Sequence, residues 1–307
     1  MLIAFLVLAF IILVIILISY LCFKIAFFAD RKIVEEEFAI PEGEIYEPYR
    51  DLMVKWMKEV KGTEKNTFTI TSFDGLKLVG RYYECIPGAP IELMFHGYRG
   101  DAKRDLCGGV QRCFKLGRNA LIVDQRACGD SEGNVITFGV KEKRDCKSWV
   151  DFMIDYFGSD VKIIITGISM GAATVLMALT EELPENVIGV LADCGYTSAK
   201  DIIKKAIKEM KLPPTLAYPF VVLGARFFGK FNLNETPPIE AVKSSKLPII
   251  YFHGESDDFV PCKMSEDNFK ATSSRSKLVT VKKAGHGLSY ILEPERYLNE
   301  LSAFFDA

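Results

Sequence analysis

Short apolar segments alternate with amphipathic segments along most of the chain. The apolar segments are rich in valine, isoleucine, leucine and phenylalanine and predict buried strands at 91–95, 119–123, 161–166, 187–192, 247–252 and 278–281. Helical spacing of apolar residues predicts helices at 146–157, 172–183, 262–271 and 297–305. Because strands that alternate with helices form parallel sheets covered on both faces, the pattern predicts an α/β fold with a mostly parallel, doubly wound sheet.

Two segments before the first of these strands have different patterns. Residues 67–72 and 76–83 alternate apolar and polar side chains around Asp74-Gly75, which predicts a β-hairpin. Residues 48–60 have apolar side chains at helical spacing with charges between them. We expect this helix to pack against the domain rather than to make a second contact with a membrane.

The N-terminus begins with 22 residues, 2–23, that carry no charge. As a helix this stretch is about 33 Å long, enough to cross the hydrocarbon core of a bilayer. A cleaved signal peptide is the alternative, but the stretch has no basic residues before it, is too long, and is followed by no small-x-small cleavage site. We expect a single-pass anchor at 1–23, followed by a juxtamembrane linker and helix at 24–66.

Charge and cysteine content add to this picture. Basic residues follow the apolar stretch at Lys24, Arg31 and Lys32, so the positive-inside tendency places the main domain in the cytoplasm, despite the acidic run Glu35–Glu37. The eight cysteines are scattered without C-x-x-C pairs, which indicates reduced thiols rather than a disulfide framework or a zinc site. The net charge of -2 argues against specific binding to nucleic acid.

Residues 196–240 interrupt the alternation of strands and helices. A helix is predicted at 198–212 with lysines on one side, and the apolar, aromatic segment 213–230 after it is broken by prolines. We expect a lid, inserted over the carboxyl edge of the sheet, that forms an apolar pocket for an acyl group. Two alternatives stay open: a helix pair that only covers the core, and a lysine-rich face that rests on anionic lipid.

A serine stands at the end of the strand 161–166, in the sequence Gly167-Ile168-Ser169-Met170-Gly171. Glycines on either side of a serine permit a tight strand-to-helix turn that lifts the hydroxyl clear of the sheet. The motif is weak by itself, and a plain buried turn is the alternative. It gains weight because Asp257 and His286 also stand just after predicted strands, and the carboxyl ends of parallel strands meet at one edge of a sheet.

These three residue types complement one another chemically. A serine hydroxyl is a poor nucleophile until a base takes its proton, and histidine suits that role because its pKa lies near neutrality. A carboxylate orients the imidazole and stabilises its cation. Of the three histidines, only His286 follows both the serine and the acid. Asp257 is preferred to Asp258 because it comes first in D-x-x-V-P, and Asp193 is a more distant third candidate.

Two further loops follow predicted strands. The first, His96–Gly100, is either an ordinary strand-to-helix loop or a loop whose Tyr98 N–H holds an oxyanion. The second, at 124–133, is polar and glycine-rich. For Asp124 and Arg126 in this second loop, we expect architectural hydrogen bonds rather than a catalytic role.

Taken in order and at their spacings, six motifs resemble those of one family: FDG at 73–75, FHGYRG at 95–100, DQRACGDSEG at 124–133, GISMG at 167–171, HGESDDFVP at 253–261 and AGHG at 284–287. Over residues 67–307 the chain resembles the α/β-hydrolase superfamily, in particular small membrane-anchored hydrolases with a serine-aminopeptidase-like core. One departure is Ala127-Cys128, where the family loop usually reads R-G-x-G, and we expect a small packing change there.

The resemblance implies roles for individual residues. Ser169 is expected to be the nucleophile, Asp257 the acid and His286 the base, with oxyanion donors at the backbone N–H groups of Tyr98 and Met170. The implied activity is that of a serine hydrolase that cleaves an ester or thioester, with a lipid-like or acylated substrate and no metal or organic cofactor. The oligomeric state and the physiological substrate do not follow from the sequence.

Two other functions compete with this one. A peptidase that releases N-terminal residues needs an anionic site for the substrate's amine, and no acidic cluster stands out among Asp201, Glu209, Glu235 and Glu240. A non-catalytic membrane scaffold on a hydrolase fold is the alternative from another class. The three complementary side chains argue against it, because a scaffold does not need them.

Overall fold

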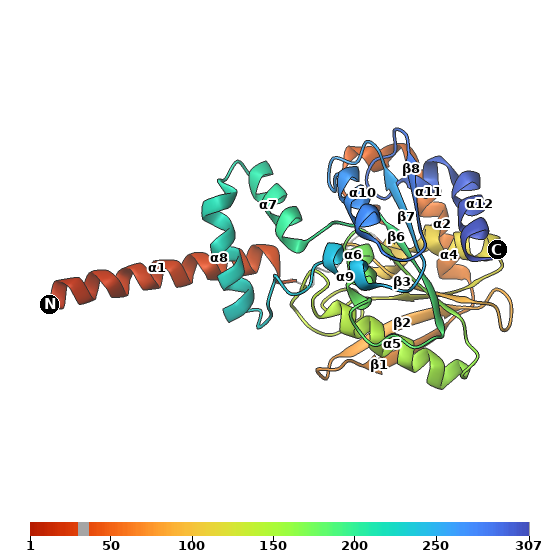
Figure 1. Ribbon diagram of the computed structural model, residues 1–307, viewed down its shortest axis with the longest axis horizontal. Coiled ribbons are helices and arrows are strands. Elements are labelled where there is room, and N and C mark those ends of the chain that lie inside the picture. The colour runs from red at the N-terminus through yellow and green to blue at the C-terminus, as the bar shows by residue number, and fades with distance from the viewer. Residues whose placement is uncertain (30–36, 307) are drawn as a thin grey trace.

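The computed structural model describes residues 1–29 and 37–306 (Figure 1). Its sheet has eight strands: β1 (Asn66–Thr71), β2 (Lys77–Tyr83), β3 (Ile91–Phe95), β4 (Asn119–Val123), β5 (Ile163–Ile168), β6 (Val187–Asp193), β7 (Ile249–Gly254) and β8 (Ser276–Val281). They lie in the order β1-β2-β4-β3-β5-β6-β7-β8. β2 is antiparallel to β1 and β4, whereas every other pair is parallel. The predicted mostly parallel sheet is confirmed.

The helices connect these strands or flank the sheet. They are α1 (Leu2–Ala26), η1 (Glu44–Tyr49), α2 (Arg50–Gly62), α3 (Ala102–Asp105), α4 (Cys107–Lys115), α5 (Glu142–Phe157), α6 (Met170–Ala178), α7 (Ala199–Glu209), α8 (Pro214–Phe227), α9 (Pro238–Ala241), η2 (Val242–Ser244), α10 (Cys262–Ala271), α11 (Ser289–Leu292) and α12 (Pro294–Phe305). β3, β4 and α10 begin and end at the predicted residues, and β1 and β2 form the predicted hairpin.

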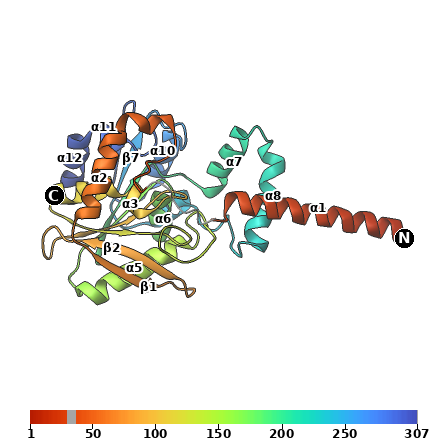
Figure 2. The same ribbon diagram turned by 180° about the vertical axis from the view of Figure 1, so that it is seen from behind.

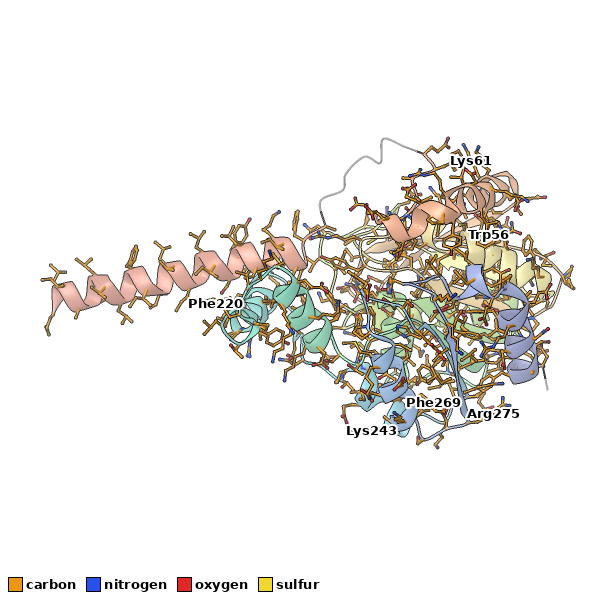
Figure 3. The ribbon with its side chains drawn as sticks, turned by 90° about the horizontal axis from the view of Figure 1, so that it is seen from above. Trp56, Lys61, Phe220, Lys243, Phe269 and Arg275 are labelled. Atoms are coloured by element: carbon orange, nitrogen blue, oxygen red, sulfur yellow. The ribbon has the colours of Figure 1, made fainter. Side chains whose placement is uncertain are left out.

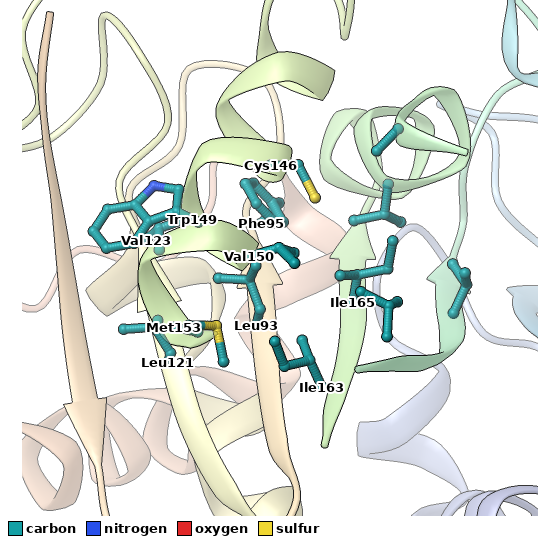
Figure 4. Close-up of a cluster of buried hydrophobic side chains, with 14 of the residues drawn as sticks. Leu93, Phe95, Leu121, Val123, Cys146, Trp149, Val150, Met153, Ile163 and Ile165 are labelled. Atoms are coloured by element: carbon teal, nitrogen blue, oxygen red, sulfur yellow. The ribbon is translucent and has the colours of Figure 1, made fainter. Parts of the chain in front are cut away.

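Helices cover both faces of the sheet, which confirms the doubly wound arrangement. Leu93 and Phe95 of β3 point to the face that α5 and α6 cover, where they pack in one cluster with Trp149 (Figure 4). Met94, between them, points to the opposite face and packs with Met57 of α2 and other residues of α2 and α4. Burial of both faces explains why these strands are apolar at nearly every position, with the buried Glu92 of β3 as an exception.

Two helices differ from the prediction: α4 was not predicted from the sequence, and α6 is shorter than predicted. α4 contains Gly108 and Gly109 in its first turn, and glycine has a low helix propensity. A Cβ at Gly108 would lie 2.9 Å from the Trp56 ring, and one at Gly109 would lie 2.7 Å from Met94 Sδ. The glycines let α4 approach α2 and β3 closely, so tertiary packing outweighs propensity here. The predicted helix at 172–183 is also shorter than expected, because α6 ends at Ala178.

α7 packs against α8, and α8 packs against α1. α1 itself projects away from the sheet (Figures 1 and 2). Almost all its side chains before Ser19 are exposed. Its length and composition suit a membrane span, although a signal sequence has the same properties. The basic residues Arg31 and Lys32, used above to orient the chain, lie outside the described residues, as do Glu35 and Glu36.

Candidate active site

The structure brings together the three side chains that the sequence singled out. Ser169 follows β5, Asp257 follows β7 and His286 follows β8, and these strands lie at one end of the sheet order with their carboxyl ends together. Ser169 Oγ lies 2.9 Å from His286 Nε2. His286 Nδ1 lies 2.7 Å from Asp257 Oδ2. With Nδ1 protonated, the imidazole donates to the carboxylate and accepts from the serine hydroxyl at the same time.

Ser169 sits at the apex of a strained turn between β5 and α6. Its φ of 58° and ψ of −119° are unusual for a residue other than glycine. A Cβ at Gly171 would lie 2.0 Å from the Phe95 carbonyl oxygen, and one at Gly167 would lie 2.1 Å from the Gly171 carbonyl carbon. The two flanking glycines are therefore needed because the backbones of β3, β5 and α6 meet at this turn with no room for a side chain.

We expect Gly171→Ala to lower the free energy of unfolding by about 3 kcal/mol, because the added methyl group forces β3 and α6 apart. Gly62→Ala is the matched control, since nothing lies within 4 Å of a Cβ at this last residue of α2. The control should leave stability unchanged or raise it by up to about 1 kcal/mol. Chemical denaturation in detergent followed by circular dichroism measures both, and equal midpoints for the two variants would contradict the packing argument.

The Asp257 carboxylate is buried and fully hydrogen-bonded. Its Oδ1 accepts from the backbone N–H groups of Phe259 (2.9 Å) and Val260 (2.8 Å). Its Oδ2 lies 3.1 Å from His253 Nε2 as well as close to His286. Burial by itself would raise the pKa of Asp257, but the hydrogen bonds with His253 and His286 outweigh burial and hold the pKa at about 2. The carboxylate is thus charged at any pH near neutrality.

The lowered pKa of Asp257 makes stability depend on acid pH. A carboxyl whose pKa is 3.8 when exposed and about 2 in the fold stabilises the fold above pH 3.8 and loses this contribution as the pH falls toward 2. The difference corresponds to about 2 kcal/mol. We expect wild type to lose about 2 kcal/mol more than Asp257→Asn between about pH 5 and pH 2. Denaturation midpoints at several pH values measure this, and parallel pH profiles would disprove it.

Each of the three histidines has a separate position. His96 is buried, accepts a hydrogen bond from the backbone N–H of Gln125 at 3.0 Å, and contacts the Gly97 carbonyl through Nδ1 at 2.8 Å. It thus braces the loop after β3. His253 contacts Ser265 Oγ through Nδ1 at 2.7 Å and Asp257 through Nε2. This support for the acid was not predicted from the sequence, although the four-residue spacing of H-G-E-S-D was a possible signal.

Two backbone N–H groups beside the serine are free to bind a ligand. A Cβ at Gly97 would lie 3.6 Å from Ser169 Cβ, so the loop 97–100 runs alongside the serine. Met170 is the first residue of α6, where helix geometry leaves N–H groups without intrahelical partners. Within the described part of the chain, no hydrogen bond is made by the N–H of Tyr98 or of Met170. Neither N–H group is therefore engaged by another group of the described chain.

The outer side of the same loop is fastened to the end of α1. Tyr98 Oη donates to the Ala26 carbonyl at 2.8 Å, and the Arg99 guanidinium donates to the Ile25 carbonyl at 2.7 Å. Phe27, which follows α1, is completely buried. The last turn of α1 is thereby docked on the domain, a contact between residues more than 70 positions apart that the sequence pattern does not indicate.

The other candidate acids lie in different surroundings. The Asp258 carbonyl accepts a hydrogen bond from Lys205 of α7. Asp193 Oδ2 accepts from Tyr297 Oη at 2.9 Å, and burial raises the pKa of Asp193. Among the residues that the structure describes, neither carboxylate is hydrogen-bonded to His286. The geometry favours Asp257 as the partner of the histidine.

The loop at 124–133 has the architectural contacts that we expected. Arg126 forms a buried ion pair with Asp145, with Nε to Oδ2 at 2.6 Å, and Asp124 pairs with Arg81 at 2.9 Å. Ala127 has a φ of 65°, in the left-handed region that favours glycine. The chain accommodates alanine there with some backbone strain, at the position where the loop of the family that the sequence resembles usually has glycine.

A metal ion is a second chemical possibility at the same place. Ligand atoms of Cys194, Asp257 and His286 all lie within 4.8 Å of one another, and Cys194 Sγ is 4.0 Å from His286 Nε2. Burial raises the pKa of Cys194 well above its ordinary value, which favours the neutral thiol over the thiolate that metals bind. The hydrogen bonds to Ser169 and Asp257 already engage both imidazole nitrogens, so the donor set fits a proton relay better. Cys194 was not singled out from the sequence.

Comparisons with known proteins agree with this topology. No protein-family model matches the chain. The structure of the esterase Pf2001 of Pyrococcus furiosus is similar with a TM-score of 0.64 and 22% identity, covering 87% of this chain and 97% of the esterase. The α/β hydrolase GrgF of a Penicillium species has a TM-score of 0.61 and 16% identity, covering 80% of this chain and 100% of GrgF.

The chain has the α/β-hydrolase fold. In this fold the nucleophile, acid and histidine follow one another along the chain, which is the order of Ser169, Asp257 and His286. A sequence relative, the uncharacterised protein YqkD of Bacillus subtilis strain 168, is 24% identical over 245 residues, covering 79% of this chain and 80% of YqkD. At these identities the similarity describes the α/β-hydrolase fold and leaves the activity to be argued from the site.

Proposed function

We propose that this α/β-hydrolase is a serine hydrolase, anchored in a membrane by α1, that cleaves a carboxylic ester or thioester through an acyl-enzyme. The observation that carries the proposal is the chain of hydrogen bonds from Ser169 Oγ through His286 to the ionised Asp257. The chemistry needs neither a metal nor an organic cofactor. We also propose that the catalytic domain lies on the cytoplasmic side.

In the first half-reaction, His286 Nε2 takes the proton of Ser169 as Oγ attacks the carbonyl carbon of the substrate. The negative charge that forms on the carbonyl oxygen is stabilised by the N–H groups of Tyr98 and Met170. His286 then gives its proton to the leaving alcohol or thiol. Asp257 stabilises the imidazolium throughout, because its low pKa keeps it charged.

In the second half-reaction, water attacks the acyl group on Ser169, with His286 again as the base. The same two N–H groups stabilise the second tetrahedral intermediate. Proton transfer from His286 back to Oγ releases the acid and restores the resting arrangement. The proton transfers between Ser169 and His286 use atoms that are already within hydrogen-bond distance, and Asp257 is already bonded to His286, so these groups need little rearrangement.

The surroundings of the serine favour an apolar acyl group. Phe259 is about half exposed and lies edge-on to the His286 ring, with ring centroids 5.0 Å apart. Met170, beside the serine, belongs to an apolar cluster that includes Phe138 and Val260 and extends to α7, α8 and α1. A cavity of about 420 Å³ is lined by residues at the start of α7, by Tyr218 of α8 and by part of 233–239. Ser169 is not among its lining residues, so we base the substrate class on the apolar cluster.

Labelling with a fluorophosphonate tests the proposal, because the reagent reacts with a serine that has a working base and oxyanion site. We expect wild type to be labelled in lipid or detergent and Ser169→Ala to remain unlabelled. Ser148→Ala is the control, since its hydroxyl is exposed on α5 and bonds only to the Arg144 carbonyl among the described residues. A folded wild type that stays unlabelled under both conditions would contradict the proposal and favour the scaffold.

A panel of substrates then separates ester hydrolysis from peptide hydrolysis. The acidic residues of the inserted segment already have partners: Asp201 accepts from Ser198, Glu209 from Lys205 and Glu240 from Lys243. Glu235 pairs with Lys143. With these carboxylates engaged, the structure favours esters over substrates with a free N-terminal amine. Faster hydrolysis of aminoacyl anilides than of p-nitrophenyl esters would support the peptidase instead.

A further inference from the structure

α8 crosses α1 at a close contact between small residues. A Cβ at Gly224 would lie 2.5 Å from the Ser19 carbonyl oxygen and 3.2 Å from Phe23 Cβ. Contacts of this kind, in which a glycine lets two helix backbones touch, are typical of helices that associate within membranes. Figure 1 shows α8 running across α1 rather than along it. A membrane that α1 crosses is thus roughly parallel to the axis of α8.

The position of this crossing along α1 determines how deep α8 lies in a membrane that α1 spans. The uncharged stretch of α1 ends at Phe23, and Ser19 stands four residues before that end. At the helical rise of 1.5 Å per residue, the crossing lies about 6 Å inside the end of the apolar stretch. Interfacial helices bury their apolar face to a depth of about 5–10 Å. If α1 spans a bilayer, α8 therefore lies at the boundary between headgroups and acyl chains.

The outer face of α8 is suited to that environment. Leu216, Phe220, Leu223 and Phe227 follow one another at spacings of four, three and four residues, which places them on one side of the helix. Leu216 and Phe227 are each 67% exposed, and Phe220 and Leu223 are partly exposed. Figure 3 shows Phe220 beyond the catalytic domain, beside the projecting part of α1. In water this apolar stripe would be costly to expose.

Exposed basic residues precede and follow the stripe in the sequence. Segment 196–240 has seven basic and four acidic residues, although the chain as a whole has a net charge of -2. Lys208 and Lys211 before α8, Arg226 near its end and Lys230 after it are all exposed. Basic side chains at the ends of an apolar helix face suit the phosphates of a lipid leaflet.

We propose that α8 is an interfacial helix whose Leu216–Phe227 stripe lies in the leaflet that α1 enters. Segment 196–240 then forms a membrane-embedded platform next to the serine. The proposal rests on the anchor role of α1 in the proposed function. The apolar cluster that includes Phe23 of α1 and Val221 of α8 also includes Met170 beside Ser169, so the platform holds the nucleophile close to that leaflet. The substrate class is then a membrane lipid rather than a water-soluble ester.

Tryptophan fluorescence quenched by brominated lipid tests where α8 lies. The full chain is reconstituted in vesicles of phosphatidylcholine and phosphatidylglycerol, with or without bromine on the upper part of the acyl chains. Phe227→Trp reports the stripe, Phe10→Trp reports the span of α1, and Tyr156→Trp is the control on α5 of the catalytic domain, where Tyr156 is 56% exposed. Wild type, with Trp56 and Trp149, supplies the background.

We expect the added fluorescence of Phe227→Trp and Phe10→Trp to be lost in brominated vesicles and that of Tyr156→Trp to be retained. Quenching of Phe10→Trp without Phe227→Trp would overturn the interfacial position of α8 and leave the anchor standing. If neither Phe10→Trp nor Phe227→Trp were quenched, both the anchor role of α1 and the interfacial position of α8 would be overturned. Quenching of all three would show that the whole domain rests on the lipid, which also overturns a specific role for α8. The measurement does not depend on enzymatic activity, so its outcome is separate from that of fluorophosphonate labelling.

Discussion

Asp257→Asn is expected to lower kcat by about four orders of magnitude while leaving the fold intact. The amide has the same shape, and its oxygen still accepts from the N–H groups of Phe259 and Val260. Its NH2 group, however, is a hydrogen-bond donor that faces His286 Nδ1. Nδ1 then has to be the unprotonated acceptor, so the imidazole adopts the tautomer that carries its proton on Nε2. His286 then no longer accepts the proton of Ser169, and the serine stays protonated.

The neighbouring residue supplies a matched control for this change. Asp258→Asn also replaces an aspartate in the same loop, but the Asp258 carboxylate is exposed, and among the described residues only the Asp258 carbonyl has a hydrogen bond, from Lys205. We expect its kcat to stay within about twofold of wild type. Ester hydrolysis and the rate of fluorophosphonate labelling measure both variants. Similar losses in the two, or a large loss in Asp258→Asn alone, would mean that the acid has been assigned to the wrong residue.

Glu92→Gln is expected to lower the free energy of unfolding by about 3–5 kcal/mol. Glu92 is 1% exposed on β3, with Oε1 at 3.1 Å from Arg118 and Oε2 bonded to Arg112. Burial tends to raise the pKa of Glu92, but the two guanidinium groups outweigh burial and lower it, so the carboxylate is charged. Without that charge, Arg112 is left buried without a carboxylate, whereas Arg118 keeps Asp306.

A surface ion pair is the control for the buried cluster. Glu240 pairs with Lys243, and both side chains are 52% exposed. Solvent screens such a pair, so Glu240→Gln should change the free energy of unfolding by less than about 1 kcal/mol. Denaturant titration in detergent compares the two glutamate variants with wild type. If Glu92→Gln unfolded at the same denaturant concentration as Glu240→Gln, the buried cluster would not be the source of stability that the geometry indicates.

Much of the architecture could be predicted from local patterns. A strand buried on both faces is apolar at nearly every position, so β3 and β4 are visible in the sequence to the residue, although β3 contains Glu92 and β4 begins with Asn119. The turn at Ser169 is visible for a similar reason, because backbones that touch at Gly167 and Gly171 exclude every side chain. By contrast, α4 was missed because its glycines serve contacts with Trp56 and Met94, which are distant in sequence.

The candidate site was also predictable from the sequence in part. Residue type and strand position were enough to select Ser169, Asp257 and His286, since the ends of parallel strands meet at one edge. That His253 supports the acid follows only from the tertiary structure, because its four-residue spacing from Asp257 does not by itself show that the two side chains are in contact.

The sequence by itself determined the α/β sheet, an apolar N-terminal helix, and the three residues proposed for catalysis. Burial, tight turns and charge restrict which residue types can occupy neighbouring positions, so these features are visible in local sequence. Only the tertiary structure decided that the end of α1 is bonded to Tyr98 and Arg99, and that α8 crosses α1 with an apolar stripe left exposed. An apolar stripe has the same sequence pattern whether it packs on protein or meets lipid. What covers it depends on contacts between segments far apart in the chain, and these exist only in the fold.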